Sequence, residues 1–479
     1  MITKFKQQYP SGVLVIFLLQ MFTMIGFAIN QSVLVLYVLK TFHMTEQHAY
    51  SLFGAYMSLA FGASVLGGYI ASIAGYRLTL LASLLLAAAG LFSLAIPGLL
   101  AFYFGLSAFV VATATSLPTI FVLLGRLYMD HDERRDSGFT IAYIGMNVGA
   151  FVAIFAAGYI EKYLNYAAAF IIGGLFMLIS FVLFYLQKEN FKVSDHIRQT
   201  TKKPKRKKLL ALLMGLIALP STGFLLTHST LSNILLIVIG FASGIFILFH
   251  AFKSHGIIRA KLLVFWILTV ISIIFWALYM LAPSALNIFV DRNVDKHLLG
   301  WAIPTITVQS LNPFFIVTVG PLLSILWIKL SQRNLEVSTP AKFAIGTLLM
   351  GAGYLVLLPG ISLASATGIV AFGWIILSYF LQTCGELLLG PVGYAMVGTL
   401  VPVPLLGIMM GIWQLATGVA GALSDYLAEL TISPSASQLP IVTDSTFAKA
   451  FAEFGLISIA VGVIAALIAP KLTRIMNAD

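Results

Sequence analysis

The feature that most constrains this chain is a succession of long apolar segments, separated by short stretches that carry charges, prolines and glycines. A helix needs roughly 20 mainly apolar residues to cross the hydrocarbon core of a bilayer, and many of these segments reach that length. Hydrophobic residues make up 60% of the chain and charged residues only 9%, whereas soluble proteins carry about 25% charged residues. The sequence therefore predicts an all-α membrane protein.

Fourteen membrane-spanning helices are expected from the breaks between the apolar segments. This pattern predicts an N-terminal six-helix bundle over 1–187, a basic linker over 188–208, two additional helices over 209–252 and a C-terminal six-helix bundle over 253–479. The expected spans lie near residues 12–39, 49–73, 79–96, 99–125, 138–160, 165–187, 209–227, 231–252, 258–283, 304–330, 341–359, 366–398, 403–427 and 448–470.

The basic residues support this count and predict an orientation. With the N-terminus in the cytoplasm, 23 of the 28 Lys and Arg residues fall in cytoplasmic loops and 5 in the opposite loops. An excess of basic residues marks the cytoplasmic side, and one missed helix would spread these charges over both sides. We therefore expect both termini in the cytoplasm, and we expect the linker 188–208 to lie against anionic membrane lipids.

The composition also argues against several function classes. The net charge of +11 is accounted for by cytoplasmic loops, so no nucleic-acid partner is expected. The single Cys excludes an internal disulfide, and the eight His residues lack the paired spacing of a zinc site. No nucleophile and base are apparent within reach of each other, so we expect no enzyme, and neither a metal nor a cofactor.

Two six-helix halves are one of the ways in which transporters are built, with the substrate site near the membrane midplane between the halves. A large polytopic chain without a soluble domain fits this architecture, and its partner would be a small-molecule substrate. The alternative from another class is a non-transporting receptor or scaffold, in which the linker 188–208 binds a partner.

The candidate site residues are polar side chains at membrane depth. Glu386 lies deep inside a span, where an ionisable group is costly and marks a functional site by default. It could carry a proton, bind a cationic group, or be a structural carboxylate tied to a neighbouring helix. Gly145 and Gly149 are expected to serve close helix packing. The neutral polar candidates are Gln20, Thr23, Gln31, Asn147, Gln309, Ser310 and Asn312, and positions 20, 23, 27 and 31 share one helical face.

Four motifs carry a resemblance to a known family. They lie at 134–151 (RRDSGFTIAYIGMNVGAF), at 309–313 (QSLNP) with Pro321, at 385–394 (GELLLGPVGY) and at 409–413 (MMGIW). In these motifs the chain resembles the proton-dependent oligopeptide transporter (POT) family, a branch of the major facilitator superfamily. The additional helix pair between the halves resembles that of bacterial members.

This resemblance implies alternating access, with uptake of di- and tripeptides driven by a proton gradient. Asn147, Asn312 and Glu386 match positions that hold the amino end of the peptide in the family, and Tyr56 matches a tyrosine of the cavity. It also implies a multi-pass protein of the bacterial inner membrane, which we expect to be a monomer.

The chain departs from the family at positions that normally carry charge. The first-helix Glu-x-x-Glu-Arg motif is replaced by Gln20, Thr23 and Met24, and Phe27 stands where a tyrosine is usual. Leu117 replaces the lysine of the fourth helix. Because removing one member of a charge network would strand the others in low dielectric, loss of the whole set suggests replacement by a neutral wall.

Three hypotheses follow from these departures. In the first, a divergent secondary transporter binds an amine-bearing or modified peptide-like substrate through Glu386, with altered coupling. In the second, an ordinary proton-coupled oligopeptide symporter is coupled through Glu386 alone. The third is the non-transporting receptor or scaffold.

Overall fold

The computed structural model describes residues 10, 12–128, 135–191, 205–298, 300–333, 335, 337–402, 405–434 and 438–478. Two sequence predictions fall partly outside them: most of the basic linker expected over 188–208, and Arg134 at the start of the first family motif. The chain forms two compact units, which we call the first unit (1–34 and 59–228) and the second unit (35–58 and 229–479).

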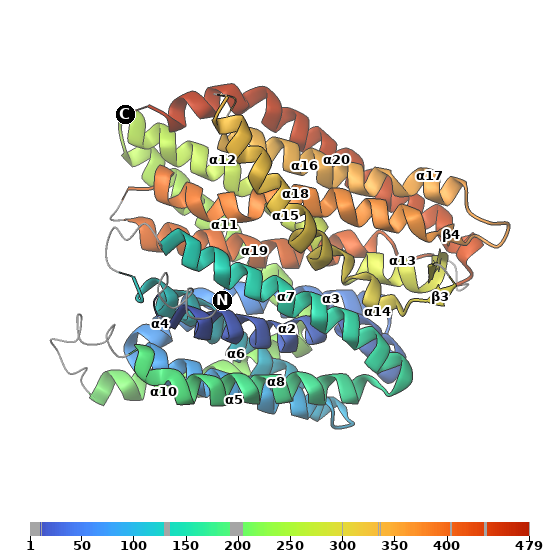
Figure 1. Cartoon of the computed structure of the whole chain (residues 1–479), viewed down its shortest axis with the longest axis horizontal. Coiled ribbons are helices and arrows are strands. Elements are labelled where there is room, and N and C mark those ends of the chain that lie inside the picture. Colours follow the sequence, from blue (N-terminus) through green and yellow to red (C-terminus); the bar gives the residue numbers. More distant parts are fainter. Residues whose placement is uncertain are drawn as a thin grey trace. The chain divides into compact units, whose positions relative to one another are not determined.

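The first unit is a bundle in which the helices run alongside one another (Figure 1). Within it α5 packs on α6 and α8, and α10, the helix after the basic linker, packs on α4 and α6. Two of its helices, α2 and α3, continue into the second unit. The elements are α2 (Gly12–Phe42), α3 (Glu46–Gly62), α4 (Ser64–Ala74), α5 (Tyr76–Leu94), α6 (Leu99–Gly125), α7 (Arg135–Tyr163), α8 (Tyr166–Gln187), the short 3-10 helix η1 (Lys188–Phe191) and α10 (Lys205–Thr227).

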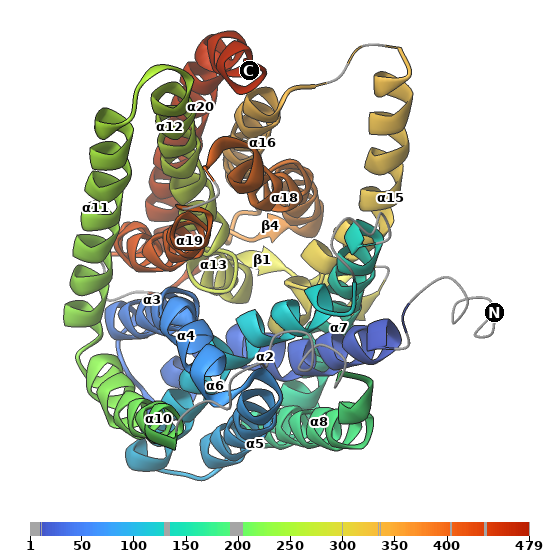
Figure 2. The same cartoon turned by 90° about the vertical axis from the view of Figure 1, so that its left-hand side faces the viewer.

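The second unit is also helical. In it α16 packs on α18 and α20, and α11 packs along α12 and α19 (Figure 2). Strand β1, after α13, pairs in parallel with β4, just before α18. Strands β2 and β3, which follow β1, form an antiparallel pair with each other. The elements are α11 (Ser229–Lys253), α12 (Gly256–Tyr279), α13 (Ala285–Asn293), β1 (Val294–Asp295), β2 (His297–Leu298), β3 (Trp301–Ala302), α14 (Thr305–Val308), α15 (Leu311–Ser331), α16 (Thr339–Leu355), α17 (Leu357–Ser362), β4 (Val370–Ala371), α18 (Phe372–Leu400), α19 (Leu406–Glu429) and α20 (Pro440–Met476).

The predicted fold class, an all-α membrane protein, is confirmed. Within the described residues, 13 helical segments are long and apolar enough to cross a membrane. They match thirteen of the expected spans, and α19 covers the remaining one, near 403–427.

Four spans differ from the sequence prediction. Those expected over 49–73 and 341–359 are each divided at a short break, into α3 and α4 and into α16 and α17. The segment expected over 304–330 is split into α14 and α15, because Pro313 has no amide hydrogen to donate to the carbonyl of Gln309. The span expected to run to 283 ends at Tyr279, and the short helix α13 follows it. Since α13 has only nine residues, it is too short to cross a bilayer and was not anticipated as a separate element.

Close glycine contacts hold α7 against α2 within the first unit. A Cβ atom at Gly145 would lie 2.6 Å from the backbone oxygen of Phe17, and one at Gly149 would clash with the backbone oxygen of Met21. The predicted packing role of Gly145 and Gly149 is confirmed, because only residues without a side chain let the two backbones approach this closely.

Candidate functional site

Glu386 lies in α18 and is buried in a small polar cluster of the second unit. Its side chain is 6% exposed, and its Oε2 accepts a hydrogen bond from Asn312 Nδ2 at 2.7 Å. The Asn312 amide also donates to Thr383 Oγ1 at 3.1 Å and accepts from the Tyr279 hydroxyl at 3.2 Å. The cluster therefore joins residues of α12, α15 and α18.

Local sequence features place these side chains together. Gly385, the residue before Glu386, brings α18 so close to α16 that a Cβ atom there would lie 2.6 Å from the backbone oxygen of Gly346. On the other side, the backbone N–H of Asn312 donates to the backbone oxygen of Gln309 at 3.3 Å and closes the turn where α15 begins. This N–H is the last backbone donor before Pro313. Glu386 is thus held by backbone packing on one helix and by a proline-interrupted turn on another.

The chemistry of this cluster is that of a carboxylate surrounded by neutral donors. Among the described residues, no Lys or Arg forms an ion pair with Glu386. A carboxylate at membrane depth is costly when charged and without a cationic partner. Glu386 can be neutralised by binding either a proton or the ammonium group of a substrate.

The other candidates of the second unit are Gln309, Ser310 and Tyr56. Gln309 and Ser310 are both 6% exposed and form the turn between α14 and α15. Tyr56 of α3 is fully buried, with its ring centroid 6.3 Å from that of Phe53.

In the first unit, the candidate residues of α2 are mostly half-buried and uncharged. Thr23, Met24, Phe27 and Gln31 are half-buried, whereas Gln20 is 2% exposed. The Thr23 hydroxyl donates to its own helix at the Leu19 oxygen, at 2.8 Å. This face carries no charged side chain, as the sequence predicts.

The remaining first-unit candidates extend this neutral character. The ring of Phe27 packs near Phe61 and Phe109, with centroids 6.1 and 6.4 Å away. Leu117 of α6 is half-buried. Asn147 of α7 is 9% exposed, and its amide donates to the Tyr143 backbone oxygen at 3.0 Å.

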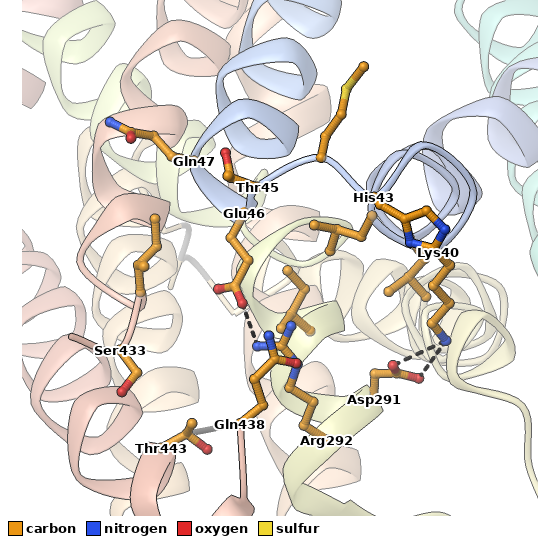
Figure 3. Close-up of a pocket in the computed structure, with 15 residues that line it drawn as sticks. Lys40, His43, Thr45, Glu46, Gln47, Asp291, Arg292, Ser433, Gln438 and Thr443 are labelled. Carbon is orange, nitrogen blue, oxygen red and sulfur yellow. Dashed lines mark hydrogen bonds and ion pairs between the residues drawn. The ribbon is translucent and has the colours of Figure 1, made fainter. Parts of the chain in front are cut away.

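A cavity of about 740 Å³ lies in the second unit, where the end of α2 and the start of α3 meet α13 (Figure 3). Two ion pairs border it. Arg292 Nη1 lies 2.6 Å from Glu46 Oε1, and Lys40 Nζ lies 3.1 Å from Asp291 Oδ2. We call these four residues the charged rim.

The charges of the rim perturb one another. Burial alone would raise the pKa of Asp291, but Lys40, the Thr305 hydroxyl and Lys296 outweigh this effect and hold the pKa below its usual value. Burial lowers the pKa of Lys296, and the attraction of Asp291 offsets this only in part. The rim is a set of mutually compensated charges, unlike the cluster around Glu386.

Comparison with known proteins decides the family. Residues 77–445 match the sequence profile of the POT family. This chain belongs to the POT family. It is therefore a multi-pass membrane transporter with the major facilitator fold, and its relatives are permeases, not enzymes.

Individual POT relatives match along nearly the whole chain. The dipeptide and tripeptide permease B of Salmonella typhimurium is 30% identical, over 98% of this chain and 97% of the relative. The crystal structure of a peptide transporter POT variant in complex with alafosfalin superposes with a TM-score of 0.86 at 27% identity, covering 98% of this chain and 96% of that one. A POT family transporter in complex with 5-aminolevulinic acid gives a TM-score of 0.84 at 25% identity, with 97% of each chain covered.

Sequence reasoning missed two groups of polar residues in this POT-family chain. The sequence analysis does not identify the charged rim, although the acid–base alternation at 291–296 and the charges at 40–46 are a possible signal. Asp425, near the end of the span expected at 403–427, is not identified either, yet it is only 3% exposed and accepts a hydrogen bond from Asn233 of α11. Its apolar neighbours in sequence were the only indication of this burial.

Proposed function

We propose that this chain is a secondary active transporter that works by alternating access on peptide-like solutes with a free amino group. The observation that carries the proposal is the 2.7 Å contact between Glu386 and Asn312 in a setting without a fixed cation among the described residues. The dipeptides and tripeptides in the names of its permease relatives, and alafosfalin and 5-aminolevulinic acid in complex with POT transporters, support this class of solute.

The proposed role of Glu386 combines substrate binding and proton coupling. When it is ionised, its carboxylate accepts a charge-assisted hydrogen bond from the substrate ammonium, while Asn312 orients the carboxylate. When a proton binds instead, the attraction for the ammonium is lost and the substrate can leave. Because an empty, ionised Glu386 is costly at this depth, proton and substrate alternate on one group.

The neutral face of the first unit is proposed to set specificity. Gln20, Thr23, Met24, Phe27, Gln31 and Leu117 offer no positive charge to a substrate carboxylate. Asn147 and Tyr56 are proposed to complete the binding of the amino end. We therefore expect a preference for substrates whose carboxyl end is absent, modified or weakly acidic.

Uptake into proteoliposomes with an acidic lumen, in which protons leave as substrate enters, tests the role of Glu386. The Glu386→Gln variant is expected to lose accumulation of an amine-bearing substrate by roughly a hundredfold, because a charge-assisted bond worth about 3 kcal/mol is removed. Glu453→Gln, which changes an acid of α20, is the matched control and should retain uptake. Strong proton-driven dipeptide uptake that survives Glu386→Gln would refute the proposal.

A gain of function tests the neutral face. Restoring a cation with Leu117→Lys should raise the affinity for a free dipeptide relative to the same dipeptide amidated at its carboxyl end, whereas Leu117→Met should leave the ratio unchanged. The ordinary symporter coupled through Glu386 is the second candidate, supported by the names of the permease relatives. It requires that the unaltered protein already prefer the free dipeptide.

The setting of this transporter is part of the proposal. Both termini are placed in the cytoplasm of a bacterial cell, in the inner membrane, with the basic linker 188–208 against anionic lipids. We propose a monomer, since each chain brings both units of the fold. A chain that binds substrate but never accumulates it, with or without the gradient, would instead support the receptor or scaffold.

A further inference from the structure

A second buried carboxylate lies in the second unit, outside the proposed substrate site. Asp425 of α19 is 3% exposed and Asn233 of α11 is completely buried. The Asn233 amide donates to Asp425 Oδ2 at 2.8 Å and to the Ser51 backbone oxygen at 3.2 Å. One amide thus ties α11 to both α19 and α3.

Two oxygen atoms of this pair are left without a donor. Asp425 Oδ1 and Asn233 Oδ1 are both buried and accept no hydrogen bond. The hydroxyl of Ser51, which borders Asp425, has one hydrogen to donate, and it donates this hydrogen to Ser229 Oγ at 2.9 Å. Leaving buried acceptors unpaired is unfavourable, by about 1 to 3 kcal/mol for each, so the site lacks something that donates.

The surrounding charges do not supply a counter-ion. Among the described residues no cation pairs with Asp425, and Arg292 of α13 is bonded to Glu46 at the start of α3. Glu429, one turn further along α19, accepts from Gln47 at 3.0 Å and adds negative charge. The other titratable groups at this end of α3 are His48 and Tyr50. On α11 and α12 the charged side chains lie at the opposite ends, at Lys253, Arg259 and Lys261, and α18 has only Glu386.

We propose that Asp425 holds a proton and forms an acid–amide pair with Asn233. A protonated carboxyl is both a donor and an acceptor, as is an amide. The O–H of Asp425 then donates to Asn233 Oδ1 while the existing N–H···O bond persists, so one proton satisfies both unpaired oxygens. The proton is taken up from water and returned to it, and no other bond changes.

This site is distinct from the one proposed for substrate, because Asp425 and Asn233 make none of the hydrogen bonds of the Glu386 cluster. Its proton fixes α11, one of the two helices beyond the basic linker, to α19 and α3. The additional helix is thereby joined to the transporter core through a protonation site.

Infrared spectroscopy of the full-length protein tests the proposal directly. In a Glu386→Gln background, a protonated carboxyl band should persist at about pH 7, where ordinary carboxyls with pKa values near 4 are ionised. The band should vanish on adding Asp425→Asn and remain on adding Glu429→Gln, the matched control one turn away. Absence of the band at this pH, or its persistence in the Asp425→Asn variant, overturns the proposal.

A second variant and a second measurement keep the proposal testable if Asp425→Asn fails to fold. Asn233→Ala should shift the carboxyl band to higher frequency, since the acid loses both hydrogen bonds, and an unshifted band contradicts the pairing. In the Glu386→Gln background the apparent melting temperature should fall as pH rises, and Asp425→Asn should flatten this dependence because its amide closes both bonds at every pH. A rise in melting temperature on replacing choline by sodium at constant pH, lost in Asp425→Asn, would identify a metal-cation site and refute the proton.

Discussion

The Glu386 cluster and the charged rim lie in the same unit, but their carboxylates have different hydrogen-bonding partners. Glu386 is bonded to an amide at 2.7 Å, whereas Glu46 faces the guanidinium of Arg292 at 2.6 Å. Both carboxylates have low exposure, at 6% for the Glu386 residue and 15% for the Glu46 side chain. The distances are nearly equal, so the partner, not the geometry, distinguishes the two sites.

This difference teaches how one type of side chain serves two purposes. A carboxylate paired with a cation is already compensated, and removing either partner strands the other. A carboxylate that meets only amides and hydroxyls remains open to a proton or an ammonium group. The rim is therefore suited to holding helix ends together, and the Glu386 cluster to binding and release.

The largest expected effect comes from neutralising each carboxylate in turn. Glu46→Gln should lower the free energy of unfolding by about 2 kcal/mol, because Arg292 is left largely buried without its partner. Glu386→Gln should change it by less than about 1 kcal/mol, since glutamine keeps an oxygen that accepts from Asn312. Apparent melting temperatures of the purified variants measure both.

A double variant separates the loss of a partner from the loss of the pair. Glu46→Met combined with Arg292→Met removes both charges and should recover most of the stability lost in Glu46→Gln. A greater loss of stability in Glu386→Gln than in Glu46→Gln would reverse the comparison and make Glu386 a structural residue.

Much of the fold was predictable from the sequence because the bilayer imposes simple rules. Apolar length predicted the approximate position of each expected span, although several of them are divided in the structure. Element ends were less predictable. The split at Pro313 depends on a single missing amide donor, and α13 is a nine-residue helix that is too short to be predicted as a membrane span.

The site was predictable only where chemistry and depth coincide in one residue. Glu386 is conspicuous because a charge at mid-span is rare. Its bond to Asn312 joins residues 74 positions apart, which neither composition nor periodicity encodes. Asp425 was missed for the opposite reason: it lies near a helix end in sequence, and only the packing of α11 on α19 buries it.

A comparable effect is expected from the packing that holds Glu386 in place. Gly385→Ala introduces a Cβ atom 2.6 Å from the Gly346 backbone oxygen and should cost about 1 to 3 kcal/mol of stability by forcing α18 away from α16. Gly390→Ala, on the same helix, meets nothing within 4 Å and should be neutral or stabilising by up to about 1 kcal/mol. Thermal unfolding compares them, and uptake should fall only in Gly385→Ala. Equal melting temperatures would show that α16 yields, and that backbone packing does not fix Glu386.

The smallest expected effect concerns the exposed pair of the rim, Lys40 and Asp291, whose side chains are 46% and 23% exposed. Solvent screening limits such a pair to less than about 1 kcal/mol. Because the folded pKa of Asp291 is depressed, the stabilisation is present above the unfolded value of about 3.9 and is lost as pH falls through the folded pKa.

Lys40→Met should therefore lower the melting temperature slightly at neutral pH, and this deficit should shrink as the solution is acidified below about pH 4. Added salt should shrink the deficit as well, since it screens exposed charges. Lys449→Met, which removes an exposed Lys of α20, serves as the control and should show neither dependence. A deficit that stays constant at every pH would mean that Lys40 acts through its aliphatic stem, and the rim would then owe its stability to the Glu46–Arg292 pair alone.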